Sequence, residues 1–198
     1  CVTGVQTCAL PISSADAGPT VKAAAGDPVV FDASGSDDPD GGPTALKFDW
    51  DFGDGTAATD AGPAPAHDYL QPGAYTVTLT VTDDDGASDS DTLTVTIHNR
   101  APYAYLYTRT NYYDPVNLTE GDPVEFYVYY YDYGRSDLLD IEIEFGDGDT
   151  ESWTDDYYGY LLMNHTYYDE GEYTLTLTVV DDDGGVTMRT LTINVENA

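Results

Sequence analysis

The chain has 198 residues, with 37 Asp or Glu against six Lys or Arg, and a formal net charge of −31. Such a charge repels phosphate backbones, which excludes nucleic acid as a partner. No stretch approaches the 18 consecutive apolar residues of a membrane-spanning helix, so we expect no membrane span in this chain.

The acidic residues are mostly aspartates, 29 Asp to 8 Glu. Three interpretations fit clusters of Asp in loops: Ca²⁺ ligation, turn formation, and a surface kept hydrated at high salt. Self-repulsion at this net charge lowers stability in dilute buffer, and salt or bound cations relieve it. A halophilic or marine origin is consistent with this composition.

The first twelve residues match neither half of the remaining chain. Residues 2–12, VTGVQTCALPI, resemble the in-frame translation of a sequencing-library adapter. A signal-peptide remnant or a lipoprotein cysteine at Cys1 is the competing interpretation, but no basic region and apolar run precede a small-residue cleavage site. We therefore interpret 1–12 as an artefact of a metagenomic fragment. Both cysteines, Cys1 and Cys8, lie within it.

Period-2 alternation predicts β-strands along the rest of the chain. Residues 44–52 place Leu46, Phe48, Trp50 and Phe52 on one side of a strand, and 75–82 alternate apolar residues with threonine. Short strands with turn residues between them are typical of an antiparallel sandwich. The sequence therefore predicts an all-β, immunoglobulin-like fold.

The alternation occurs twice. Residues 75–86, YTVTLTVTDDDG, return as YTLTLTVVDDDG at 173–184, and FGDG at 52–55 returns at 145–148. A repeat of this length is a whole domain. We expect domains at 13–99 and 100–198, joined by the short linker HNRAP (98–102), and we expect the natural protein to continue as a longer array.

Three ordered motifs in the first copy resemble the polycystic-kidney-disease (PKD) domain: FDASGSDDPDGG (31–42), WDFGDGT (50–56) and HDYLQPGAYTVTLTVTDDDG (67–86). The second copy resembles a diverged PKD domain, with Ile143 in place of the tryptophan. The resemblance implies a non-catalytic β-sandwich module of extracellular or cell-surface proteins. It also implies calcium in some members, so calcium is the expected cofactor.

Candidate calcium ligands in the first copy are carboxylates that the strand pattern brings near one another, since Ca²⁺ takes six to eight oxygens. They are Asp37, Asp38, Asp40, Asp49, Asp51, Asp83 and Asp84. The second copy offers a looser set with a different loop: Asp132, Asp137, Asp140, Glu142, Glu144 and Asp182. The alternative for both sets is an ordinary solvated acidic surface.

Tyrosine distinguishes the second copy, which holds 16 of the 18 tyrosines after residue 100. In YVYYYDY (127–133), burying alternate residues leaves tyrosines on the other face. An exposed aromatic face suits protein contacts or stacking on sugars. The candidate binding face is Tyr127, Tyr129, Tyr130, Tyr131, Tyr133, Tyr157, Tyr158 and Tyr160, and the alternative is ordinary strand packing.

Two N-x-T sequons, at Asn117 and Asn164, are candidate glycosylation sites. The recurring H-x-Y motifs at His67 and His165 favour a structural role over zinc, because no second nitrogen or sulfur ligand is nearby in the sequence. The sequence shows no H-E-x-x-H, G-x-S-x-G or phosphate-loop motif, so we expect no enzyme activity.

The sequence thus predicts a spacer, adhesion or assembly unit outside the cell or on its surface. Its expected partners are neighbouring PKD repeats and other surface proteins or polysaccharide. The alternative is an accessory module that binds polysaccharide or collagen for a secreted hydrolase.

Overall fold

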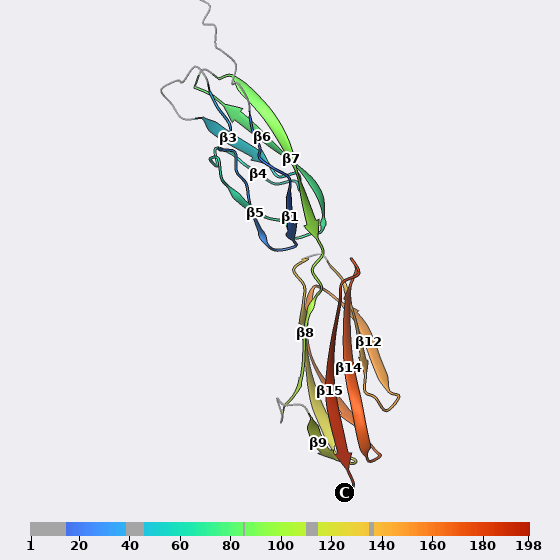
Figure 1. The fold of residues 1–198 in the computed structure, drawn as a ribbon. Helices are drawn as coiled ribbons and strands as arrows, with labels where there is room; N and C mark the ends of the chain where they lie inside the picture. The colour runs from blue at the N-terminus through green and yellow to red at the C-terminus, as the bar shows by residue number, and fades with distance from the viewer. Residues whose placement is uncertain (1–14, 39–45, 85, 110–114, 135–136) are drawn as a thin grey trace, which may run out of the picture. The chain divides into compact units, whose positions relative to one another are not determined.

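The computed structural model describes residues 15–38, 46–84, 86–109, 115–134 and 137–198. The chain divides into two compact units between His98 and Asn99, and each is a β-sandwich (Figure 1). The predicted all-β, immunoglobulin-like fold is confirmed. Among the described residues, no helix is long and apolar enough to cross a membrane.

The described residues of unit 1 form seven strands. They are β1 (Val21–Ala24), β2 (Pro28–Val30), β3 (Lys47–Asp51), β4 (Ala57–Ala58), β5 (Ala66–Asp68), β6 (Gly73–Thr82) and β7 (Ser88–His98). One sheet has the order β1-β7-β6-β3-β4, and β2 pairs with β5 in the other. The strands β3, β6 and β7 are antiparallel, whereas β1 runs parallel to β7.

In the part of unit 2 that the structure describes, there are eight strands. They are β8 (Tyr103–Thr108), β9 (Val116–Thr119), β10 (Pro123–Tyr131), β11 (Leu139–Glu144), β12 (Thr150–Asp155), β13 (Tyr158–Thr166), β14 (Gly171–Asp181) and β15 (Val186–Glu196). One sheet has the order β12-β11-β14-β15-β9, and the other has the order β13-β10-β8. The parallel pair β9–β15 repeats β1–β7 of unit 1.

The cores follow the predicted alternation. Phe48, Trp50 and Phe52 are buried in unit 1, and Ile141, Ile143 and Phe145 are buried in unit 2. The Trp50 indole N–H donates to the Gly62 carbonyl at 3.1 Å, so the one polar group of this side chain is satisfied.

The H-x-Y motifs close each sandwich in the same way. The Tyr69 hydroxyl donates to the Phe52 carbonyl at 2.9 Å, and the Tyr167 hydroxyl donates to the Phe145 carbonyl at 3.0 Å; both tyrosines are buried. The His67 ring stacks on Phe52 with ring centroids 4.1 Å apart. The motif is therefore part of the packing, as the sequence predicts.

Candidate functional site

The acidic cluster of unit 2 is the most strongly defined candidate site. Carboxylate oxygens of Asp137, Asp182 and Asp183 lie within 4.8 Å of one another. Asp137 follows β10 and precedes β11, and Asp182 and Asp183 follow β14. The turn sequence DDDG thus provides two of the three carboxylates, and the loop after the tyrosine-rich strand provides the third.

Two buried aspartates adjoin this cluster. Asp132 and Asp181 are 6% and 3% exposed. Oδ1 of Asp132 accepts the Gly134 backbone N–H at 3.0 Å, while its Oδ2 is buried and has no hydrogen-bond partner. A buried carboxylate oxygen without a partner is costly, and a cation bound nearby would offset that cost.

The pKa values of two of these aspartates are shifted upward, as expected for crowded and buried carboxylates. Burial raises the pKa of Asp132, and the charges of Asp181 and Asp183 raise it further. Burial, followed by the charges of Asp182 and Asp181, raises the pKa of Asp183. Like charges crowd this end of the sandwich, and a bound cation would relieve their repulsion.

Asp181 connects the start of unit 2 to this cluster. The Asn99 side-chain amide lies 3.0 and 2.9 Å from the two carboxylate oxygens of Asp181. The Gly185 N–H also donates to Asp181, at 2.6 Å. Three segments that are distant in the sequence therefore meet at one group of carboxylates.

This donor set suits a hard cation. Carboxylate oxygens from two loops, some of them buried, are the ligands that Ca²⁺ prefers, and Ca²⁺ tolerates irregular geometry. The residues that would hold it are Asp132, Asp137, Asp182 and Asp183. Asp140, Glu142 and Glu144, also considered from the sequence, instead lie exposed on the outer face of β11.

The predicted ligands of unit 1 are only partly brought together. Asp83 is 6% exposed; its Oδ1 accepts the Ala87 N–H at 2.8 Å, and its Oδ2 is buried without a partner. Asp83 is the counterpart of Asp181 in the repeated DDDG turn, but both oxygens of Asp181 accept hydrogen bonds. Asp84 follows it and is exposed, Asp37 and Asp38 lie in the loop after β2, and Asp40 lies outside the described residues.

Asp49 and Asp51 instead hold turns at the outer face of β3. Asp49 accepts the Asp60 N–H at 2.8 Å, and Asp51 accepts the Gly53 N–H at 2.9 Å. In the described part of unit 1, no three His, Cys, Asp or Glu side chains come close enough to form a metal group.

The second group of possible ligands lies at the FGDG turn of unit 2. Asp147, Asp149 and His165 have ligand atoms within 4.8 Å of one another, and His165 Nε2 lies 2.6 Å from Asp147 Oδ2. In unit 1, His67 Nε2 lies 2.7 Å from Asp54 Oδ2. The repeat of a satisfied His–Asp hydrogen bond favours a structural role in both units.

The tyrosine-rich segment forms an outer face of the sheet β13-β10-β8. Tyr127, Tyr129 and Tyr131 face outward, and Tyr158 and Tyr160 are more than half exposed. Tyr133 packs edge-on against Tyr131, and Tyr157 packs against Tyr158.

The prediction that Tyr130 belongs to the binding face is wrong: this side chain is 1% exposed, because it points into the core between its outward neighbours.

Tyr130 has an internal role. Its hydroxyl donates to Asp155 at 2.6 Å and accepts the Trp153 indole N–H at 3.1 Å. Burial, with this hydrogen bond to Asp155, raises the pKa of Tyr130 to about 12. The sequence also shows Tyr103, Tyr105 and Tyr107, and the structure places these on the same outer face as Tyr127.

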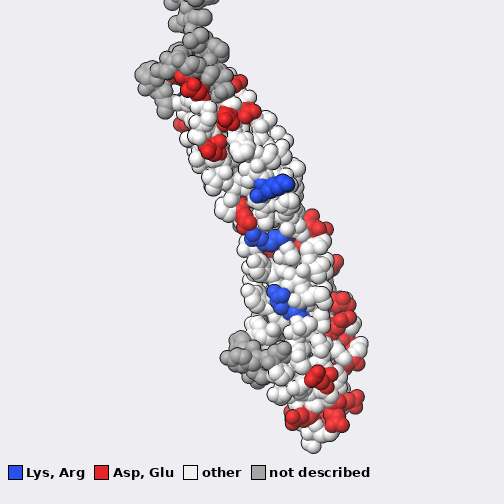
Figure 2. Space-filling model, viewed as in Figure 1, with Lys and Arg blue, Asp and Glu red and all other residues white. Residues whose placement is uncertain are grey.

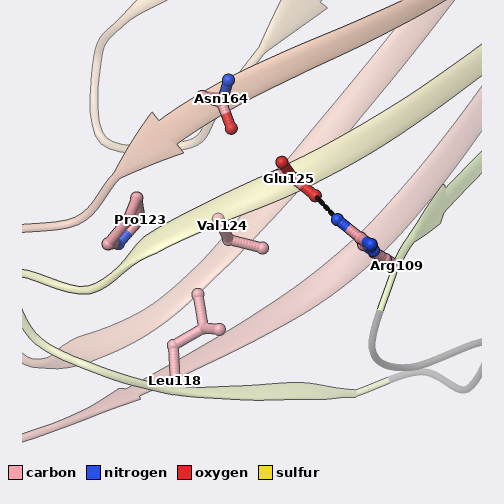
Figure 3. A pocket seen from close by; sticks show the side chains of 6 residues that line it. All are labelled: Arg109, Leu118, Pro123, Val124, Glu125 and Asn164. Carbon is pink, nitrogen blue, oxygen red and sulfur yellow. Dashed lines mark hydrogen bonds and ion pairs between the residues drawn. The ribbon is translucent and has the colours of Figure 1, made fainter.

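The sequon asparagines lie on strands. Asn117 belongs to β9, where its side-chain oxygen accepts from Asn194 at 3.2 Å. Asn164, on β13, lines a pocket with Leu118, Pro123 and Val124 and with the ion pair of Arg109 and Glu125 (Figure 3). Both side chains are exposed, so the geometry leaves both sequons accessible.

Two immunoglobulin-like sandwiches with this repeated turn chemistry define a class of tandem β-sandwich modules. The PKD domain family model matches residues 10–97 and 109–196. The chain belongs to the PKD domain family, as two tandem copies.

The chain is also similar to several solved structures. The PKD domain of an M14-like peptidase from a Thermoplasmatales archaeon is 22% identical, over 50% of this chain and 98% of that chain, with a TM-score of 0.41. The PKD1 domain of Vibrio anguillarum Epp is 27% identical, over 51% of this chain and 100% of that chain, with a TM-score of 0.36. Fibronectin(III)-like modules of Clostridium thermocellum CbhA are 18% identical over 94% of each chain, with a TM-score of 0.35.

Proposed function

We propose that this chain is a non-catalytic spacer and assembly segment of an extracellular or cell-surface protein, and that calcium stabilises unit 2. The observation that carries the calcium part is the buried, unpartnered Oδ2 of Asp132 beside the carboxylates of Asp137, Asp182 and Asp183. Membership of the PKD family supports a non-catalytic module of this location.

A cation at this cluster would join three segments of unit 2. The loop that follows β10, the turn between β14 and β15, and Asn99 before β8 are connected through Asp132, Asp181 and their neighbours. Binding to the folded state alone stabilises it by RT ln(1 + [L]/Kd), or about 2.7 kcal/mol at a hundredfold excess over Kd. Calcium would therefore stiffen this end of the sandwich.

Asp83 supports a second, weaker location in unit 1. Its buried Oδ2 lies in the DDDG turn of unit 1 and has no partner, but Asp49 and Asp51 already accept backbone N–H groups. We therefore propose the calcium site first for unit 2, and Asp83 as the residue on which a site in unit 1 would depend.

Thermal unfolding of the full chain tests the calcium proposal. The chain is melted in EDTA, and then with millimolar CaCl₂, millimolar MgCl₂ or molar NaCl. Saturating calcium is expected to raise the Tm of unit 2 by on the order of 10 °C, and magnesium to raise it less. Stabilisation by molar NaCl alone, with calcium and magnesium equivalent, would contradict the site.

Two aspartate variants of equal net charge distinguish binding at the cluster from general screening of charge. Asp183→Asn removes one carboxylate of the cluster, whereas Asp156→Asn removes an exposed carboxylate elsewhere in unit 2. The calcium-dependent rise is expected to disappear in Asp183→Asn and to remain in Asp156→Asn. Equal responses from both variants would assign the effect to general screening.

The alternative is an accessory module that binds polysaccharide or collagen for a secreted hydrolase. The exposed tyrosines of unit 2 favour it, because aromatic rings with hydroxyl groups contact sugars and proteins well. Retention on chitin, cellulose or collagen in calcium and high salt would support this alternative. Failure to bind any of them would count against it.

A further inference from the structure

The outer face of the sheet β13-β10-β8 is an ordered grid of aromatic side chains. The strand register aligns three rows: Tyr103, Tyr131 and Tyr158; Tyr105, Tyr129 and Tyr160; and Tyr107, Tyr127 and Leu162. We call these nine side chains the tyrosine face. We propose that the tyrosine face packs against the same face of a second copy of the chain, and this inference rests on the assembly role in the proposed function and names its partner.

The orientation of the tyrosine rings determines which ring faces are open to a stacking ligand. Tyr103 and Tyr131 stack with centroids 4.8 Å apart and planes 3° apart, and Tyr107 and Tyr127 stack at 5.2 Å and 3°. In these two pairs, one face of each ring is therefore covered by its neighbour. A sugar ring stacks on an open aromatic face, so these stacked pairs suit a protein surface better than a polysaccharide.

The charge pattern favours a second copy. None of the nine positions is Asp or Glu, although the chain carries a net charge of −31. On the opposite sheet of unit 2, by contrast, the outward residues of β11 are Asp140, Glu142 and Glu144. Two like-charged chains can approach only where neither presents acids, and the tyrosine face meets this condition.

The surface of unit 2 shows the same asymmetry. In Figure 2 its acidic side chains gather on the side where β12 and β14 lie, whereas the surface over β8 is mostly uncharged, with Lys or Arg side chains. At one end of the tyrosine face, the Arg100 guanidinium lies 4.8 Å above the Tyr133 ring. The other end carries the Arg109–Glu125 ion pair.

The exposed area is sufficient for a weak dimer. Tyr103, Tyr105, Tyr158, Tyr160 and Leu162 are 36%, 52%, 58%, 56% and 46% exposed. With 150–250 Å² for each side chain, these exposed fractions correspond to roughly 370–620 Å². A stable interface buries about 800 Å² per partner, so this face predicts reversible association at high protein concentration.

An identical face also offers matching hydrogen-bonding groups. Each tyrosine hydroxyl both donates and accepts, so two such faces can form hydrogen bonds with each other in either direction. Tyr129, at the centre of the grid, would lie at the middle of the interface.

Sedimentation equilibrium of the full chain tests this proposal. It is run in 1–3 M NaCl to screen the net charge, with a thiol reductant so that Cys1 and Cys8 cannot cross-link the copies, and with calcium or with EDTA. The average mass is expected to rise from monomer toward dimer with concentration in both calcium and EDTA. Association that depends on the tyrosine face and is the same in calcium and EDTA can be distinguished from any effect of the proposed calcium site.

Exposed tyrosines provide matched variants. Tyr105→Glu with Tyr160→Glu places two charges in the central row, and Tyr168→Glu, at a position 79% exposed outside the face, is the control. The central pair is expected to weaken association at least tenfold even in high salt, because the interface would then bury unpaired carboxylates. Tyr168→Glu is expected to leave the association constant unchanged.

A second pair of substitutions distinguishes loss of the interface from misfolding. Tyr105→Thr with Tyr160→Thr removes the rings but keeps residues that favour strands, and unchanged Tm and far-UV circular dichroism would verify folding. The threonine pair is also expected to weaken association. A chain that stays monomeric at every concentration would overturn the proposal, as would a dimer unaffected by either pair. Retention of a monomeric chain on chitin or cellulose, lost in the same variants, would assign the face to polysaccharide instead.

Discussion

The Nε2 atom of His165 lies 2.6 Å from Oδ2 of Asp147, and the imidazole ring stacks on Phe145 at 4.0 Å. Unit 1 repeats both contacts with His67, Asp54 and Phe52. A turn and a strand are therefore held together by one hydrogen bond and one ring contact in each copy. This pair has measurable consequences for stability at low pH.

Asp147→Asn is expected to reduce the loss of thermal stability that unit 2 shows as the pH falls. Burial alone would raise the pKa of Asp147, but hydrogen bonds from His165 and the Asp149 N–H lower it below its usual value. A lowered folded pKa gives stability that is complete above the unfolded value of about 3.9 and is lost as the pH falls through the folded pKa. Tm measured from pH 6 to pH 2 checks this.

Asp149→Asn is the control for that series, because it removes a neighbouring carboxylate of the same turn. The wild type and Asp149→Asn should lose Tm more steeply than Asp147→Asn below about pH 4. Parallel curves for all three proteins would show that the His165–Asp147 bond contributes nothing in this range.

Tyr167→Phe is expected to destabilise unit 2 by about 1–3 kcal/mol, because the buried Phe145 carbonyl loses its donor. Tyr173→Phe removes a similar bond, to the Asp169 carbonyl, but at an exposed position, and should cost well under 1 kcal/mol. Urea denaturation measures both. Equal losses would mean that burial does not increase the contribution of the Tyr167 hydrogen bond to stability.

Gly146→Ala is expected to destabilise unit 2 more than Gly148→Ala. Both glycines have positive φ, 87° and 104°, so both alanines carry the cost of a left-handed backbone, about 1–2 kcal/mol. A Cβ at Gly146 would also lie 2.6 Å from the Thr174 carbonyl oxygen, whereas a Cβ at Gly148 would meet open space. The difference between the two free energies of unfolding reports this close approach, and no difference would refute it.

The sequence predicted the sandwich and its cores because one face of each strand is apolar. The alternation around Trp50 and Ile143 required no tertiary information, and the repeated FGDG and H-x-Y motifs marked the same packing in both units. The family resemblance agreed with these patterns, and the family match confirms it.

The candidate sites depended on register and loop conformation, which the sequence could not supply. The segment YVYYYDY does not show which alternate set of tyrosines is buried, so the sequence does not separate Tyr130 from its exposed neighbours. The sequence DDDG does not show which carboxylates converge, so it does not indicate that Asp183 joins Asp137 and Asp182. The rows of the tyrosine face appear only once β8, β10 and β13 are aligned.

Calcium titration of the full chain by calorimetry, in molar NaCl, tests the central claim most directly. We predict a saturable calcium-binding event that magnesium reproduces only weakly, that Asp183→Asn abolishes and that Asp156→Asn retains. An isotherm identical in the wild type and Asp183→Asn, or no calcium heat above the salt background, would contradict a calcium-stabilised unit 2.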